Sequence, residues 1–109
     1  MDCLNQIKTA LLSVSNTVSH YTALKKKPPY LVWAEDGSGD CQWADGRMTA
    51  QVITGTIDLF TLSGDPLVDS VQTALDTAGI SWKLNSVQYE EDTKLLHYEW
   101  RWEVGDYNL

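Results

Sequence analysis

The spacing of apolar residues near the N-terminus predicts a first helix. Four of them recur at intervals of three or four positions: Leu4, Ile7, Leu11 and Val14. This spacing places all four on one face of a helix, and Asp2 just before them is the expected N-cap. Polar and β-branched residues take over from Ser13, so the helix should end there. Short extended structure is expected within residues 18–24.

A second helix is predicted between residues 66 and 78. Asp65 is a favourable N-cap, Pro66 suits the first helical position, and Gly79 is the expected left-handed C-terminal cap. One apolar stripe runs along the segment: Leu67, Val68, Val71, Leu75 and Ala78. A start signal, an apolar stripe and a stop signal therefore all agree on this helix.

Four β-prone runs each predict a strand. They cover residues 30–34, 50–62, 80–90 and 94–104, with a turn at 91–93 and a frayed tail at 105–109. Alternation in the second run assigns to the core Ile53, Gly55, Ile57, Leu59 and Thr61. Alternation in the last run gives one face to Leu96, Tyr98, Trp100, Trp102 and Val104. Most of these rings should lie in the core, and some of the aromatic residues are expected at a subunit interface.

These elements predict a single α+β domain over residues 1–109. Their order is α-β-β-α-β-β, and one extra short strand before Pro28 is left open. Runs of adjacent strands favour an antiparallel, possibly mixed, β-sheet with both helices packed on one face. The Pro28-Pro29 pair marks a hard boundary before the first main strand, because proline cannot continue a helix.

A glycine- and aspartate-rich segment at residues 36–47 is the strongest candidate for a contact region. It predicts either a long, mobile loop or the tip of an extended hairpin. Loops of this length inside a small domain are often functional. Its candidate interface residues are Asp36, Asp40, Trp43, Asp45 and Arg47.

A basic run at Lys25, Lys26 and Lys27 is a second candidate contact. It is either a solvated turn or a contact with an acidic neighbour, which would be another subunit or nucleic acid. The formal net charge of -7 argues against a domain that binds nucleic acid as a whole, and against adhesion to anionic membranes. No apolar window is long enough for a spanning helix, and no signal peptide is visible, so we expect the chain to begin in a cytoplasm.

The residues that could carry chemistry do not form a recognisable catalytic set. His20 and His97 are the only histidines, and neither lies in a motif with a nucleophile or an acid; His97 is expected to face solvent. Cys3 and Cys41 are too few for a disulfide scaffold and do not have zinc spacing, so free thiols are expected. We therefore predict that the chain is not an enzyme.

Two binding motifs fail on inspection of the segment 36–47. A calcium-binding loop counted from Asp36 needs Gly at its sixth position and Glu at its twelfth, where the chain has Cys41 and Arg47. The glycines at 37 and 39 are not followed by the Lys-Ser/Thr of a phosphate-binding loop. No metal and no cofactor is predicted.

The layout resembles the small tail-completion proteins of tailed bacteriophages and prophages, the tail terminator family. Beside the amphipathic N-terminal helix, the similar strings are PPYLVW (28–33), VITGTIDLFT (52–61), DPLVDSVQTAL (65–75) with Gly79-Ile80, and the closing hairpin VQYE (87–90) to LHYEW (96–100). The similarity covers nearly the whole chain. It consists of a pattern of elements and short strings, and the family offers no catalytic residues to carry over.

The resemblance implies a structural virion protein. Such proteins form a ring, commonly a hexamer, that caps the tail tube, stops its elongation and joins it to the head connector. The expected partners are therefore further copies of the chain, the tail tube protein and the head–tail connector, with DNA passing through the lumen without specific binding and no membrane contact. The expected location is the virion tail or neck, after assembly from the host cytoplasm.

Two alternatives stay open. One is a head-closure or neck connector protein of the same phage module, and the other is a non-viral, monomeric binding module. In the ring interpretation, we expect residues 36–47 to reach toward a neighbour or the lumen, where acidic side chains would repel passing DNA.

Overall fold

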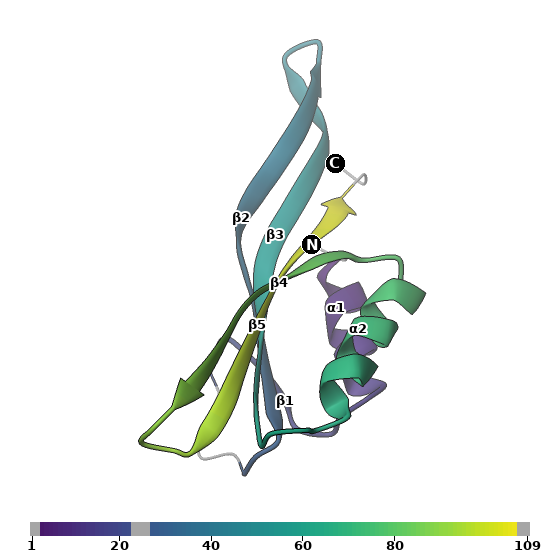
Figure 1. The fold of residues 1–109 in the computed structure, drawn as a ribbon. Coiled ribbons are helices and arrows are strands. Elements are labelled where there is room, and N and C mark those ends of the chain that lie inside the picture. The colour runs from purple at the N-terminus through teal and green to yellow at the C-terminus, as the bar shows by residue number, and fades with distance from the viewer. Residues whose placement is uncertain (1–2, 23–26, 107–109) are drawn as a thin grey trace.

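The computed structural model describes residues 3–22 and 27–106 and has two helices on one face of a twisted sheet (Figure 1). In chain order the elements are α1 (Leu4–Leu12), β1 (Val18–His20), β2 (Tyr30–Ala44), β3 (Arg47–Thr61), α2 (Leu67–Thr77), β4 (Ser81–Glu90) and β5 (Leu95–Asp106). Within the described residues the sheet has five strands in the order β1-β2-β3-β5-β4. The α+β class with both helices on one face is confirmed.

The predicted strand order is wrong in one respect, because it omits β1. This strand pairs in parallel with β2, with Val18 opposite Leu31 and His20 opposite Trp33, so the sheet is mixed rather than purely antiparallel. All other described neighbours are antiparallel. A strand of three residues carries too little alternation to be separated from a loop by its sequence pattern, although the extra short strand before Pro28 was left open.

The two predicted core faces are confirmed for β3 and for most of β5. Burial along β3 alternates strictly from residue 53 to residue 61, and the odd positions are the buried ones. In β5, Trp100, Trp102 and Val104 are buried, and Tyr98 packs against the core as a partly buried side chain. The helices contribute four fully buried side chains to the same core: Ile7, Leu11, Val71 and Leu75.

The contacts predicted at both ends of α2 are present in the structure. The carboxylate of Asp65 accepts a hydrogen bond from the Leu67 backbone N–H at 2.8 Å, and the Thr61 hydroxyl donates to the same carboxylate. At the other end Gly79 has a φ of 71°, and the N–H of Ile80 reaches back to the Leu75 carbonyl at 2.9 Å. The expected N-cap of α1, Asp2, lies outside the described residues.

The sheet approaches itself most closely at Gly55 of β3. A Cβ atom built there would lie 2.1 Å from the Ala34 carbonyl oxygen and 2.2 Å from the ring of Trp102. Because glycine lacks this atom, the Trp102 indole lies over the strand and donates its Nε1–H to the Thr56 carbonyl at 2.9 Å. Trp100 beside it donates to the side-chain oxygen of Gln72 at 3.2 Å, which links α2 to the sheet.

The closing hairpin has nearly the predicted bounds. β4 and β5 are joined through a turn that ends at Lys94, which has a positive φ of 62°. β5 continues to Asp106, further than predicted, since residue 105 pairs with Val52 and residue 106 with Gln51. The remaining tail, 107–109, lies outside the described residues. Across the part of the chain that the structure describes, no helix is both long and apolar enough to cross a membrane.

Candidate functional site

The segment 36–47 forms strands rather than a loop, so the hairpin alternative is the one that the structure supports. β2 continues to Ala44, β3 begins at Arg47, and only Asp45 and Gly46 connect them. Both connecting residues have positive φ, 52° and 75°, which is the geometry of a type I′ turn. Asp-Gly is a preferred sequence for this turn, so the dipeptide was a signal for a hairpin that the composition of the segment obscured.

This hairpin projects beyond the helices as an arm, defined here as residues 37–53 (Figure 1). β5 supports β3 only as far as Gln51, so residues 42–50 are paired with each other and with no other described strand. Eight β2 residues between Asp36 and the turn correspond to roughly 25 Å of extended chain. The described molecule is accordingly elongated, with extents of 53 × 25 × 23 Å.

The arm exposes most of its side chains. Trp43, opposite Met48 near the tip, is 64% exposed, the highest value for any described Trp or Tyr. A two-stranded hairpin is only marginally stable by itself, and the largely exposed indole of Trp43 adds little hydrophobic stabilisation. The arm, 17 of the 109 residues, therefore contributes little to the core apart from Ile53 at its base.

The pairing of the arm is interrupted at three places. Register shifts occur between Glu35 and Gly37, between Ser38 and Cys41, and between Gln42 and Trp43. Bulges of this kind increase local twist, and they are common at sheet edges that must be re-aimed or protected. Asp36 and Asp40, two of the predicted site residues, lie at the first two of these shifts.

Asp36 anchors the base of the arm to β5. Its carboxylate accepts hydrogen bonds from the Arg101 guanidinium at 2.7 and 3.4 Å and from the Thr54 hydroxyl at 3.0 Å. The Arg101 hydrogen bond, followed by that of Thr54, lowers the pKa of Asp36 although partial burial opposes this. Asp36 was predicted to contact a partner, and the structure gives it a contact within the chain.

The other predicted residues fall into two groups that the structure keeps apart. Asp40, Trp43, Asp45 and Arg47 lie along the distal arm, with Arg47 opposite Ala44. Lys27 is exposed and precedes the opposite end of β2, while Lys25 and Lys26 lie outside the described residues. Lys27 and the distal arm therefore do not form one site on a single copy.

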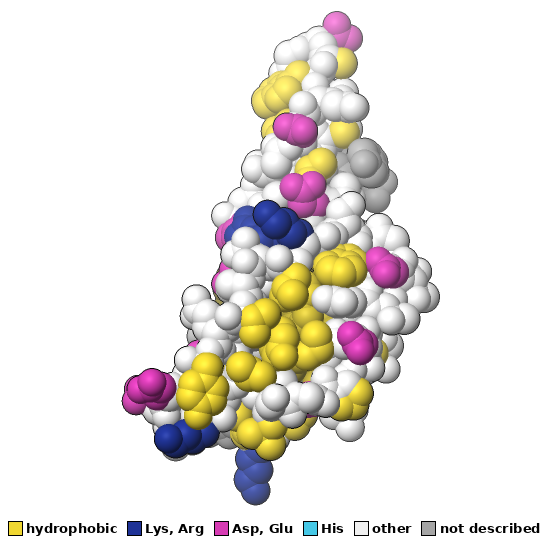
Figure 2. Space-filling view, viewed as in Figure 1, with side chains coloured by type: hydrophobic (Ala, Val, Ile, Leu, Met, Phe, Trp, Pro, Cys, Tyr) yellow, Lys and Arg dark blue, Asp and Glu magenta, His cyan; other side chains and the backbone are white. Residues whose placement is uncertain are grey.

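The outer strand β4 carries exposed hydrophobic side chains that sequence reasoning did not identify. β4 pairs only with β5 among the described residues, so its other edge is open. Three of its large hydrophobic side chains are exposed and form what we call the β4 patch: Leu84, Val87 and Tyr89. Hydrophobic side chains gather over β4 beside α2 (Figure 2).

A bulge keeps the β4 patch on one face. The register shifts between Leu84 and Ser86, so the face changes from even to odd positions along β4. Leu84 lies opposite Trp100 and Val87 opposite Tyr98, and these two β5 residues share the face that carries the helices. The patch thus continues the core face beyond the area that α2 covers.

Both histidines have acidic partners, contrary to the expectation for His97. The His97 ring lies 2.6 Å from the Asp58 carboxylate through Nε2 and 3.3 Å from that of Glu90 through Nδ1, and only 22% of its side chain is exposed. It stacks on Phe60, whose ring stacks in turn on Tyr30. Burial raises the pKa of Asp58, and the His97 hydrogen bond opposes that rise.

His20 forms a similar but more exposed contact. Its Nε2 lies 2.6 Å from the Glu35 carboxylate, and its ring stacks on Trp33 at 3.9 Å between centroids. Burial of Glu35 favours the neutral acid, but hydrogen bonds from Tyr21, its own backbone and His20 together lower the pKa of Glu35. Both contacts join neighbouring strands of the sheet, His20 of β1 with Glu35 of β2 and His97 of β5 with Asp58 of β3.

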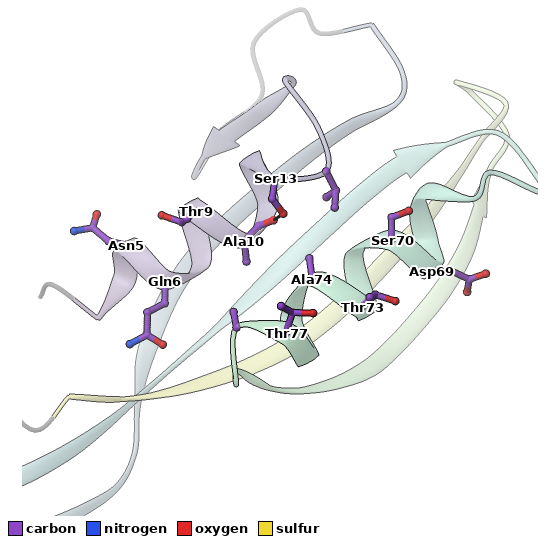
Figure 3. Close-up of a pocket in the computed structure, with 12 residues that line it drawn as sticks. Asn5, Gln6, Thr9, Ala10, Ser13, Asp69, Ser70, Thr73, Ala74 and Thr77 are labelled. Carbon is purple, nitrogen blue, oxygen red and sulfur yellow. Dashed lines mark hydrogen bonds between the residues drawn. The ribbon is translucent and has the colours of Figure 1, made fainter.

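A groove of about 890 Å³ lies between the two helices. Ala10 of α1 and Ala74 of α2 point toward each other there, and short polar side chains such as Thr73 and Thr77 line it (Figure 3). Small residues let the helices approach and leave this groove on their outer side. Among the residues that the structure describes, no predicted site residue lines this groove, and Asp69 is the only charged side chain that does.

In the described part of the chain, no three His, Cys, Asp or Glu side chains are placed together to hold a metal ion. Cys3 lies in the core, and Cys41 lies on the arm. A scan against protein-family models gives no match, and a search of curated proteins finds no significant relative.

Proposed function

We propose that the chain is a structural subunit of a tailed-phage virion, similar to a tail terminator. In this proposal several copies form a ring that caps the tail tube, stops its elongation and joins it to the head connector. The chain performs no chemical step and requires no cofactor. The ring leaves a lumen for DNA, which passes without specific binding.

The observation that supports this proposal best is the exposed arm. It projects away from the core, carries the 64% exposed Trp43, and is held at its base by the Asp36–Arg101 pair. A ring needs two different surfaces on each subunit, because its interfaces are head-to-tail. The arm and the β4 patch are two such surfaces, and they lie on different strands at opposite sides of the sheet order.

Charge supports a position beside DNA without binding to it. The net charge is -7, and four acidic side chains with no basic one occur in residues 34–45. A lumen lined by acidic side chains repels the phosphate backbone and does not retain it. A head-closure ring would also need an acidic lumen, so charge does not distinguish a tail terminator from a head-closure protein.

Co-expression with the tail tube protein of the same gene cluster tests the proposal. We expect tubes that end in a ring of this chain, and shorter tubes as its concentration rises, visible by negative-stain electron microscopy. Tubes of unchanged length that do not co-sediment with the chain would contradict the tail terminator function. Binding to the head connector but not to tubes would indicate the head-closure alternative.

A further inference from the structure

The tip of the arm carries an apolar pair that is suited to insertion into another molecule. Trp43 lies directly opposite Met48 in the pairing of β2 with β3, so the two side chains project from the same face of the hairpin. Trp43 is largely exposed, and its ring loses the stabilisation that burial would give. An apolar hollow on a second molecule could supply that burial.

The groove between α1 and α2 is a hollow of this kind. Ala10 and Ala74 point toward each other across it, as Figure 3 shows, and Val14 and Ala78 add further apolar lining. Its volume of about 890 Å³ is larger than one Trp and one Met side chain together. Asp69 is the only charged side chain among its described lining residues, so burial of a neutral insert leaves few charges without water.

The polar atoms of the groove suit a tryptophan in particular. An indole ring has one N–H donor, which needs an acceptor when the ring is buried. The hydroxyls of Thr73 and Thr77 on α2 and the side-chain amide of Gln6 on α1 line the groove and can accept it (Figure 3). The three side chains of the β4 patch offer only the Tyr89 hydroxyl. The groove is therefore the better receptor for Trp43.

The arm and the groove of one copy are too far apart to contact each other. Both helices lie beside the body of the sheet, and the arm projects beyond them, with its Asp45-Gly46 turn at the far end (Figure 1). The strand that leads from Asp36 to this turn corresponds to roughly 25 Å of extended chain. Only a groove on a second copy, placed beyond the body in the direction of the arm, can receive the tip.

From these features we infer that the arm of one copy inserts Trp43 and Met48 into the groove between α1 and α2 of the next copy. The inference rests on the proposed function and names the interface that would build the ring. An arm and a groove are different surfaces, so the contact is head-to-tail and closes when the rotation between copies permits it. Because each arm extends past its own body, the copies follow one another along the arms, and the ring axis is transverse to the strands.

Sedimentation velocity of the full chain over a concentration series, up to millimolar, tests the inference. We expect oligomers larger than a dimer, and self-association about tenfold weaker or more in Trp43→Ala and in Thr73→Lys, which puts a long charged side chain into the groove. Thr93→Lys is the matched control, the same change at an exposed threonine in the β4–β5 turn, and it should associate as the wild type does. Loss of association in Tyr89→Ala but not in Thr73→Lys would identify the β4 patch as the receptor and overturn the inference. Thermal unfolding identifies any variant that simply fails to fold.

Mixing the two defective variants tests the head-to-tail contact itself. Trp43→Ala keeps an intact groove and Thr73→Lys keeps an intact arm, so an equimolar mixture should form a heterodimer with one working interface and no larger species. A mixture of the two folded variants that stays monomeric, or a wild-type chain that stays monomeric throughout, would overturn the inference. Rings that persist in both variants would also overturn it and would leave the proposed ring function intact, whereas arm–groove oligomers that do not cap tail tubes would contradict the proposed function alone.

Discussion

Strands β2 and β3 run through both the arm and the rest of the described molecule, which we call the body, but the two parts are stabilised differently. In the body, β2 and β3 carry Leu31, Ile57 and Leu59, which are fully buried beneath the helices. In the arm no helix covers these strands. Residues 42–50 also lack a third described strand beside them. The body is thus stabilised by its own packing, whereas the distal arm has little packing within the described chain.

The two regions differ in how closely their side chains must fit together. The body requires specific shapes, such as a glycine beneath an indole ring at Gly55. The arm is turned by Asp45-Gly46 at its tip and is tied to β5 at its base by the Asp36–Arg101 pair. Substitutions should therefore affect folding in the body and association in the arm.

Replacing a core tryptophan should have the largest effect. Trp100→Ala removes a fully buried side chain and its hydrogen bond to Gln72, so we expect a loss of about 3–5 kcal/mol in the free energy of unfolding. Trp43→Ala is the matched change in the arm and should stay within about 0.5 kcal/mol. Urea denaturation followed by circular dichroism compares them, and equal losses would contradict the distinction between body and arm.

Adding a single methyl group to glycine should give the next largest effect. Gly55→Ala forces the new Cβ against the Ala34 carbonyl and the Trp102 ring, which should cost about 1–3 kcal/mol or more. In Gly37→Ala in the arm the new Cβ atom would have no neighbouring heavy atom within 4 Å, so stability should change by less than about 0.5 kcal/mol. A shift in the melting temperature for Gly55→Ala alone is the expected result; tolerance at Gly55 would show that the Trp102 packing is wrong.

The His97 contact should be of intermediate importance. His97→Leu leaves the half-buried Asp58 carboxylate without its hydrogen bond, which we expect to cost about 1–3 kcal/mol. His20→Leu removes a contact whose imidazole is 41% exposed, and should cost less. Chemical denaturation at neutral pH ranks the two, and a larger loss at His20 would contradict the assignment of His97 to the better-buried pair.

The ion pair at the base of the arm should have the smallest effect on stability. Asp36→Asn removes an exposed pair and should cost no more than about 1 kcal/mol. Because the pKa of Asp36 is lowered in the folded state, its stabilisation is present above about pH 4 and is lost as the pH falls through the lowered value. The difference between wild type and variant should therefore vanish on acidification, and a difference that grows in acid would contradict the pair.

Much of the body could be predicted from the sequence because its signals are local. The buried odd positions of β3 and the Gly79 cap follow from alternation and from backbone chemistry that neighbouring residues determine. β1 was expected only as short extended structure within residues 18–24, since three residues carry no usable period. The His97–Asp58 contact joins residues 39 positions apart, and only the pairing of β3 with β5 brings them together.

The contact surfaces were predicted only in part for a related reason. The composition of residues 36–47 marked them as a candidate contact region. Glycine and aspartate favour loops and turns alike, so the extended hairpin was only one of two predicted alternatives, beside a mobile loop. The β4 patch was missed because the bulge between Leu84 and Ser86 shifts the alternation in the middle of the strand. The exposure of the β4 patch also depends on where α2 ends, and the sequence of β4 alone does not contain that information.

Shortening the arm tests the central claim most directly. Residues 42–50, which pair only with each other, would be replaced by an Asn-Gly turn that joins Cys41 to Gln51. The shortened chain and the wild type would be compared by sedimentation velocity and by thermal unfolding. We predict that the melting temperature stays within a few degrees and that self-association is lost. Oligomers that persist without the distal arm, or a body that unfolds without it, would contradict the account.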